Sequence, residues 1–253
     1  MFSSPSNAVL RGMFATSNGT NSQFIVTISS TPVSIQVNFF RRSRSGQLEL
    51  VQSVPLQQKK TNWSSFASGP NGSVFCAILY STCVHEIFRS HGAAVTPFAD
   101  SSTAHGLPAV VHYICGLQCV GEQRLVASFN DRSVRVFFAS GGALTELQRI
   151  PWSAADGTPY TLVGLPNGGV CVKSDVNDPT TSIRKYNIDF CTVDANGTLS
   201  SPRRLEQFTN GIDVWCHLRL SEASDSSHRI ILAEYDAKWN KTLALRMYLC
   251  QQD

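Results

Sequence analysis

Short runs of alternating or continuous apolar residues, separated by small polar turns, follow one another along the whole chain. SVFCAILY, SVRVFF and RIILAEYD are representative runs. Alternation at a period of two residues, with enrichment in Val, Ile and Phe, is typical of β-strands. No window shows the 3.6-residue period of an amphipathic helix. The pattern therefore predicts an all-β chain of many short strands.

The turns between these runs recur in a fixed order. The first turn of a unit contains Asn-Gly in SNGTN, PNGS and PNGG, a hairpin signal because both residues tolerate a positive φ. The second carries Asp, Asn, Ser or Pro, as in SSTP, NDR and NDPTTS, which also favour turns. The third has a small residue before an alternating run, as in RSRSGQLEL (42–50), ASGGALTEL (139–147) and DANGTLSS (194–201). This order predicts repeated units of four antiparallel strands, a to d.

The repeat length indicates the architecture. Strand a begins near residues 8, 63, 109, 160 and 214, and four-stranded sheets at such a period are the blades of a β-propeller. We predict one domain, residues 1–253, forming a β-propeller or a propeller segment of about five blades, the last without its outer strand. A pair of β-sandwiches is the alternative, although it does not require the turn classes to recur in order. The expected blades lie near residues 8–56, 63–100, 109–152, 160–209 and 214–253.

Composition narrows the environment of the chain. A net charge of +3 is too mild to indicate a nucleic-acid or membrane partner by itself. The eight cysteines sit mainly in apolar runs, which is typical of reduced, buried thiols. Cys115 and Cys119 lack a second pair at zinc spacing, so we predict no metal and no cofactor. Without a leader-like segment or eighteen consecutive apolar residues, we expect an intracellular protein, cytoplasmic or nuclear, with no membrane association.

Residues 124–150, RLVASFNDRSVRVFFASGGALTELQRI, resemble strands b, c and d of a WD-repeat blade. Phe137 and Phe138 stand where that family has Trp-Asp, and no Gly-His pair precedes a strand a, so the resemblance implies the blade without the structural hydrogen-bond relay of the family. SGQLELVQSVPLQQKKTNWSSFASGPNGSVFCAI and VDANGTLSSPRRL also resemble lactonase-type propellers. No catalytic residue of that family can be placed on a matching position.

Protein–protein interaction is the function that the pattern favours. In the predicted ring, the d-to-a and b-to-c connections share one face, and loops on a rigid scaffold commonly carry function. Trp239 is the strongest candidate anchor, because a Trp in a polar turn is often an interface residue; packing against its own unit is the other interpretation. We predict a non-catalytic scaffold within a larger complex. Its expected loop-face contacts are Trp239, Lys241, Asp131, Arg132, Lys59 and Lys60.

The incomplete last unit offers a second mode of binding. An open sheet edge is a template for strand addition, so another protein subunit, or a further part of a longer parent chain, is expected to pair with the C-terminal blade. The edge residues of this hypothesis are Leu243, Leu245, Met247 and Leu249. A basic patch of Arg41, Arg42 and Arg44 suits phosphate or RNA, but no aromatic platform accompanies it, so a solvated hairpin tip is favoured over nucleic-acid binding.

A lactonase-like hydrolase is the alternative function. His112, His217 and Arg219 lie on strands expected near the axis, where a channel site would form, and Asp156 and Asp213 are carboxylates on neighbouring connections. No Gly-x-Ser-x-Gly elbow or glycine-rich phosphate loop identifies a nucleophile. The six histidines show no metal spacing, and structural roles are favoured for them. The sequence therefore ranks the scaffold above the enzyme.

Overall fold

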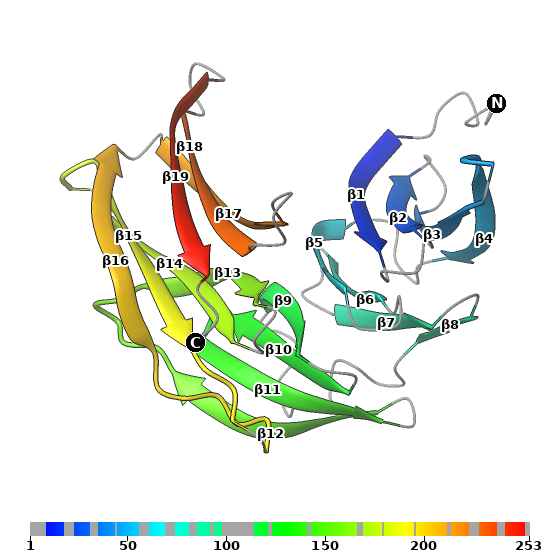
Figure 1. The fold of residues 1–253 in the computed structure, drawn as a ribbon, viewed down its shortest axis with the longest axis horizontal. Helices are drawn as coiled ribbons and strands as arrows, with labels where there is room; N and C mark the ends of the chain where they lie inside the picture. Colours follow the sequence, from blue (N-terminus) through cyan, green and yellow to red (C-terminus); the bar gives the residue numbers. More distant parts are fainter. Residues whose placement is uncertain are drawn as a thin grey trace. The chain divides into compact units, whose positions relative to one another are not determined.

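The chain folds into β-strands joined by turns. The computed structural model describes residues 9–17, 23–30, 35–43, 45–55, 61–68, 74–80, 85–91, 94–97, 114–120, 123–140, 143–165, 169–178, 180–194, 196–211, 214–222, 228–236 and 241–250. All regular secondary structure in these ranges is β (Figure 1), so the prediction of an all-β chain is confirmed. Within the same ranges no helix has the length and apolarity of a membrane span.

The strands pair with their neighbours in sequence to form antiparallel sheets. Four sheets have four strands each, and a fifth has three strands among the described residues. This is the predicted order of hairpins. The chain divides into two compact units, described separately below: Met1–Tyr113 with Ala139–Leu144, and Ile114–Phe138 with Thr145–Asp253.

The first unit contains two sheets. In each of them the strands follow chain order, and the first strands of the two sheets, β1 and β5, lie next to each other, as do their last strands, β4 and β8. The first sheet comprises β1 (Val9–Ser17), β2 (Gln23–Ser30), β3 (Ile35–Arg42) and β4 (Leu48–Pro55). The second comprises β5 (Thr61–Ser68), β6 (Val74–Tyr80), β7 (His85–His91) and β8 (Ala94–Pro97).

The second unit holds the other three sheets. The first strand of its middle sheet, β13, lies beside β9 of the preceding sheet and β17 of the following one, so three successive first strands are neighbours. The strands are β9 (Ile114–Val120), β10 (Arg124–Phe129), β11 (Ser133–Ser140) and β12 (Ala143–Pro151). The middle sheet has β13 (Thr158–Gly164), β14 (Val170–Asp178), β15 (Ile183–Cys191) and β16 (Arg203–Gly211). The last has β17 (Val214–Glu222), β18 (His228–Asp236) and β19 (Lys241–Cys250).

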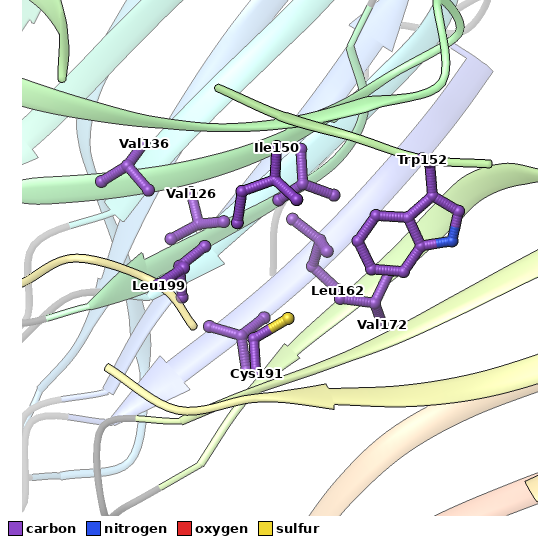
Figure 2. Packing of buried hydrophobic residues seen from close by; sticks show 10 residues of the cluster. Val126, Val136, Ile150, Trp152, Leu162, Val172, Cys191 and Leu199 are labelled. Atoms are coloured by element: carbon purple, nitrogen blue, oxygen red, sulfur yellow. The ribbon is translucent and has the colours of Figure 1, made fainter. Parts of the chain in front are cut away.

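A shared hydrophobic core joins the sheet β9–β12 to the sheet β13–β16. Val126 and Val136 from the first sheet pack with Leu162 and Val172 from the second. Trp152, in the connection between the sheets, closes the cluster (Figure 2). Burial of these side chains is the main favourable term that holds the two sheets face to face.

The inner part of the sheet β13–β16 is buried on both faces, whereas its outer strand β16 is mostly exposed. Val170 and Val172 of β14 belong to the core shared with β9–β12. Cys171, between them, points to the opposite face and packs with Tyr186 and Ile188. Successive residues of a strand face opposite sides, so the continuous apolar run GVCVK is needed to fill both. Two buried faces are what radial packing of sheets requires.

The turns use two different solutions for left-handed backbone. In two c-to-d turns the residue with positive φ is a glycine, Gly46 (φ 83°) or Gly197 (φ 78°), and its N–H donates to the carbonyl three residues back. In the b-to-c turns it is Arg132 (φ 61°) and Ser182 (φ 54°). Glycine adopts this conformation without steric cost, whereas Arg and Ser adopt it only at a steric cost. Arg132 and Ser182 therefore occupy equivalent, strained backbone positions.

A register shift recurs where strand a pairs with strand b. In all four four-stranded sheets the pairing skips one residue near the start of strand a. The skipped residues are Arg11, Asn62, Cys115 and Tyr160. The β17–β18 pair is continuous over its described length. Such bulges bend a strand and redirect a side chain, and Tyr160 is 38 % exposed.

Candidate functional site

Three short connections of the second unit form the candidate site, which we call the loop face: residues 130–132, 153–157 and 180–182. The backbone N–H of Trp152 donates to the carbonyl of Arg132 at 2.6 Å, which ties the second connection to the first. The Nδ2 amide of Asn187 in β15 donates to the carbonyl of Asp156 at 2.9 Å. The connection between the two sheets is therefore fixed to both of them.

Gly157 completes this connection with a backbone that no other residue fits. Its φ is 83°, and a Cβ at this position would lie 2.1 Å from the carbonyl oxygen of Asp175 in β14. The close approach of backbone to backbone requires the absence of a side chain. The loop face is thus positioned by main-chain packing as well as by hydrogen bonds.

A fully buried guanidinium supports the first connection. Arg135 in β11 has no exposed side-chain surface. It pairs with Asp131 in the turn and with Glu146 in β12, where Nη1 lies 3.3 Å from Oε2. Its Nε donates to Ser133 Oγ at 2.9 Å, and its Cζ lies 4.3 Å from the centroid of the Phe129 ring. Burial of a charge is tolerated only when pairing is this complete.

A second ionic cluster supports the 153–157 connection. Arg204 in β16 donates from Nη2 to Asp156 and from Nε to Asp189, each at 2.5 Å, and from Nη1 to Asn187 Oδ1 at 2.9 Å. Burial raises the pKa of Asp189 despite the opposing effect of Arg204. Partial burial lowers the pKa of Arg204, but its bonds to Asp189 and Asp156 raise it above its ordinary value. Asp156 therefore serves to anchor the loop.

Buried charge also lies beneath the third connection. Arg184 in β15 donates from Nε to Asn177 and lies 3.9 Å from Asp175 Oδ2. Lys173 places its Nζ 5.4 Å from the centroid of the Tyr186 ring. Burial raises the pKa of Asp175, while the charges of Lys173 and Arg184 oppose the rise. No three His, Cys, Asp or Glu side chains of the described residues are grouped as a metal site.

The turn between β14 and β15 is capped by Asp178. Its Oδ1 accepts from the backbone N–H of Thr180 at 2.9 Å and from the Thr180 hydroxyl at 2.6 Å. These hydrogen bonds and that from Thr181 lower the pKa of Asp178 to about 2 from 3.8. Because the ionised form is favoured by folding, its contribution to stability is present above pH 3.8 and is lost as the pH falls towards 2.

Replacing Thr180 by Val tests this cap. Loss of the hydroxyl removes one donor to the carboxylate, so the pKa of Asp178 is expected to rise towards 3.8. A carboxyl ¹³C NMR titration measures it. Thr192→Val, at an exposed residue outside this turn, should leave the Asp178 titration unchanged; equal curves for the wild type and Thr180→Val would show that the hydroxyl does not hold the carboxylate.

Cys191 illustrates how inert the core thiols are. Burial first, and the charge of Asp189 second, raise the pKa of this thiol to about 12. The thiolate is the reactive form, so we expect Cys191 to resist a thiol reagent at pH 8 in the folded protein and to react in denaturant. Mass spectrometry of the labelled peptides measures this. Rapid labelling of Cys191 in the native chain would contradict its buried position.

The predicted site residues fall into three groups. Asp131 and Arg132 lie on the loop face, with Asp131 bound to Arg135 and Arg132 exposed. Lys241, His217, Arg219, Arg41 and Arg42 are placed as strand residues only. Outside the described residues lie Trp239, Lys59, Lys60, Arg44, His112 and Asp213. The contacts expected of these residues stay predictions.

The predicted open edge corresponds to β19, which among the described residues pairs with β18 alone. Leu243, Leu245, Met247 and Leu249 all lie on this strand. The register shifts at Leu243, because Glu234 is opposite Ala244 while Tyr235 is opposite Thr242. A bulge of this kind twists an edge strand. The regular part of the edge is therefore Ala244–Cys250.

Sequence reasoning missed the buried ionic clusters. Arg135, Asp189 and Arg204 were not among the predicted site residues, although Arg135 stands inside the run SVRVFF. A charged residue at an inward position of an apolar strand signals a buried partner. The partners could not be named, because Asp131 and Glu146 come from different elements.

Comparison with known proteins gives fold-level similarity alone. No family model matches the chain, and no curated protein matches it. Solved structures resembling it include the WD40 domain of SCAP from fission yeast (11 % identity, 100 % of this chain and 68 % of that chain, TM-score 0.46). The N-terminal domain of Nup159 is another, with 10 % identity, a match over 93 % of this chain and 73 % of that chain, and a TM-score of 0.44. A third is Chaetomium thermophilum Raptor, with 14 % identity, a match over 96 % of this chain and 20 % of that chain, and a TM-score of 0.47.

The SCAP domain among these structures is described as a WD40 domain, the class that residues 124–150 resemble. The chain spans about a fifth of the Raptor chain that it resembles.

Proposed function

We propose that this protein is a non-catalytic β-propeller scaffold that binds other proteins through its loop face. The proposal includes five blades around one axis. It is supported by the shared core of the sheets β9–β12 and β13–β16 and by the adjacency of β9, β13 and β17. The observation that carries it is the immobilised loop face, whose short connections are fixed by hydrogen bonds to both sheets.

Rigid, exposed loops suit protein recognition because little conformational entropy is lost on binding. The loop face presents the exposed side chain of Arg132. Ile183, which is 44 % exposed, borders the loop face, because it begins β15 directly after the connection 180–182. The neighbouring acids Asp131 and Asp156 are already paired within the fold. Arg and large apolar side chains are enriched at protein interfaces, and other protein subunits are the partners that this surface fits.

Strained backbone at Arg132 and Ser182 supports the same surface. A non-glycine residue in the left-handed region costs about 1 kcal/mol or more, and such outliers cluster at functional sites. The c-to-d turns of the same chain use glycine in that conformation. Side chains retained at Arg132 and Ser182 are thus consistent with a binding role on this face.

Binding of cellular partners to matched variants tests the proposal. Arg132→Gly removes the side chain but suits φ 61°, and Ile183→Ser removes the exposed apolar group. Leu147→Ser is the control, because Leu147 is 53 % exposed on β12 and outside the loop face. Quantitative affinity purification should show that the Arg132→Gly and Ile183→Ser variants lose the same proteins, and that Leu147→Ser retains them. Equal recovery from all three variants would reject the loop face as the binding surface.

The edge of β19 is a second proposed contact. Strand addition at Ala244–Cys250 would complete a four-stranded sheet, and the missing strand is proposed to be the outer one. Hydrogen exchange of the isolated chain tests whether the edge is unpaired, because every second amide of an unpaired β19 points away from β18 and should exchange rapidly. Protection of all β19 amides in the monomer would show that the edge is already paired.

The same purification separates the two contacts. Leu245→Asp and Met247→Asp place charges on the regular part of β19, and charges protect an edge from pairing. Partners that bind by strand addition should be lost in these variants and retained in Arg132→Gly.

A further inference from the structure

Asn196 and Gly197 lie in an inter-sheet contact of the second unit. The turn that contains them joins β15 to β16, and the Arg124 guanidinium of β10 donates to the main-chain carbonyl of Asn196. Gly197 packs so tightly against this guanidinium that a Cβ there would lie 2.0 Å from Arg124 Cζ. Asn196 itself is exposed to solvent. A cation is therefore held on the peptide bond between Asn196 and Gly197.

The cation is not matched by a carboxylate in the described part of the chain. Among the ion pairs of these residues none includes Arg124, and its Nε is buried without a hydrogen-bond partner. The carbonyl of Asn196 is thus the acceptor of a charge-assisted hydrogen bond. Such a bond draws electron density from the peptide and stabilises negative charge on it.

We propose that Asn196 is a site of spontaneous deamidation that Arg124 promotes. The Gly197 nitrogen, after losing its proton, attacks Cγ of Asn196: the N–Cγ bond forms, the Cγ–Nδ2 bond breaks, and ammonia leaves with a proton. Water then opens the five-membered imide at either carbonyl and gives aspartate or isoaspartate. No electrons are transferred, and water is the only co-reactant. Arg124 promotes the first step because it stabilises the deprotonated peptide.

Glycine at position 197 suits the reaction because no side chain hinders the attacking nitrogen. In the folded turn that N–H donates to the carbonyl of Asp194 at 2.8 Å, so this one hydrogen bond must break for attack while Arg124 stays on the Asn196 carbonyl. Local opening of surface turns costs little compared with global unfolding. The exposed side chain of Asn196 gives water access to the imide.

Deamidation here would alter the contact between two sheets. Isoaspartate lengthens the main chain of the turn, which disturbs the bond from Gly197 to Asp194. The next residues of the turn are held from β12, where Gln148 donates to the carbonyl of Leu199 at 2.9 Å and accepts from its N–H at 2.8 Å. Aspartate at 196 would instead give Arg124 its missing carboxylate.

Incubation of the full chain at neutral pH, followed by peptide mass spectrometry, tests the proposal. Asn210–Gly211 is an internal control, since it is the same dipeptide in β16 with Asn210 opposite Arg184 in register. Arg124→Gln is expected to slow conversion of Asn196 about tenfold, which corresponds to ~1.4 kcal/mol of transition-state stabilisation, and to leave Asn210 unchanged. An unchanged Asn196 rate in this variant, with Asn210 also unchanged, would overturn the proposal.

Faster conversion of Asn210 in Arg124→Gln would show that this variant unfolds. A measurement on the wild type then tests the proposal instead. Urea separates Arg124 from Asn196 without any substitution. The Asn196 rate itself is the measured quantity here, because unfolding frees Asn210 from β16 and changes its rate independently of Arg124. The Asn196 rate is expected to fall when the wild-type chain is unfolded, and a rate that stays the same or rises would show that Arg124 does not promote the reaction in the folded chain.

Discussion

Replacing Arg135 by Met is expected to lower the free energy of unfolding by about 3 kcal/mol. The side chain of Arg135 is fully buried, and it pairs with Asp131 and Glu146. Breaking a buried ion pair from one side leaves the other charges without compensation and costs about 3 to 5 kcal/mol. The lower end applies, because Asp131 and Glu146 are partly exposed. Urea unfolding followed by circular dichroism measures the change.

Arg149→Met is the matched control for this prediction. Arg149 binds the same carboxylate, Glu146, with Nε at 3.1 Å from Oε1, but its own side chain is 48 % exposed. Exposed ion pairs contribute about 1 kcal/mol or less. Similar losses in the two variants would show that burial of the guanidinium does not determine the effect.

Replacing Trp152 by Ala is expected to cost about 3 to 5 kcal/mol, since removal of a large buried aromatic side chain both loses transfer free energy and leaves a cavity. Trp152 is 6 % exposed and lies in the core that joins two sheets. Its loss should also loosen the loop face, because the buried indole fixes the position of residue 152, whose backbone N–H donates to the carbonyl of Arg132. Chemical denaturation measures the stability, and hydrogen exchange measures the loop.

Leu147→Ala on the preceding strand provides the comparison. Leu147 is 53 % exposed, so its truncation should change stability by about 0.5 kcal/mol or less. A small loss in Trp152→Ala, close to that of Leu147→Ala, would contradict a core shared between the sheets β9–β12 and β13–β16.

Strand order was accessible from sequence because it depends on local signals. Period-two alternation and turn residues placed β14 and β15 on either side of NDPTTS, and the structure pairs them across this turn. The continuous apolar run GVCVK likewise indicates a strand buried on both faces, as Val172 and Cys171 show. Each of these features is decided by neighbours in the chain.

The ionic clusters depend on residues that are far apart in sequence. Asp156 and Arg204 are separated by 48 positions, and Arg124 reaches Asn196 across 72. Nothing in the local pattern fixes which carboxylate or carbonyl meets a given guanidinium. For this reason Asp156 could be named as a carboxylate of interest, while its role as the anchor of residues 153–157 became apparent only from the packing of the strands.

The strained turn residues were also beyond the reach of sequence. The dipeptides Asn-Gly and Ser-Gly predict a positive φ at Gly197 and Gly46, and both glycines have a positive φ. Arg132 and Ser182 adopt the same conformation without a glycine to signal it. At Arg132 and Ser182, tertiary packing overrides the local backbone preference, which no sequence pattern signals.

Hydrogen–deuterium exchange of the chain, alone and bound to a partner recovered in the affinity purification, tests whether the loop face is the binding surface. Binding is expected to slow exchange at the three connections of the loop face, residues 130–132, 153–157 and 180–182. Slowing confined to the outer strands β12 and β16, with no change at these connections, would contradict it.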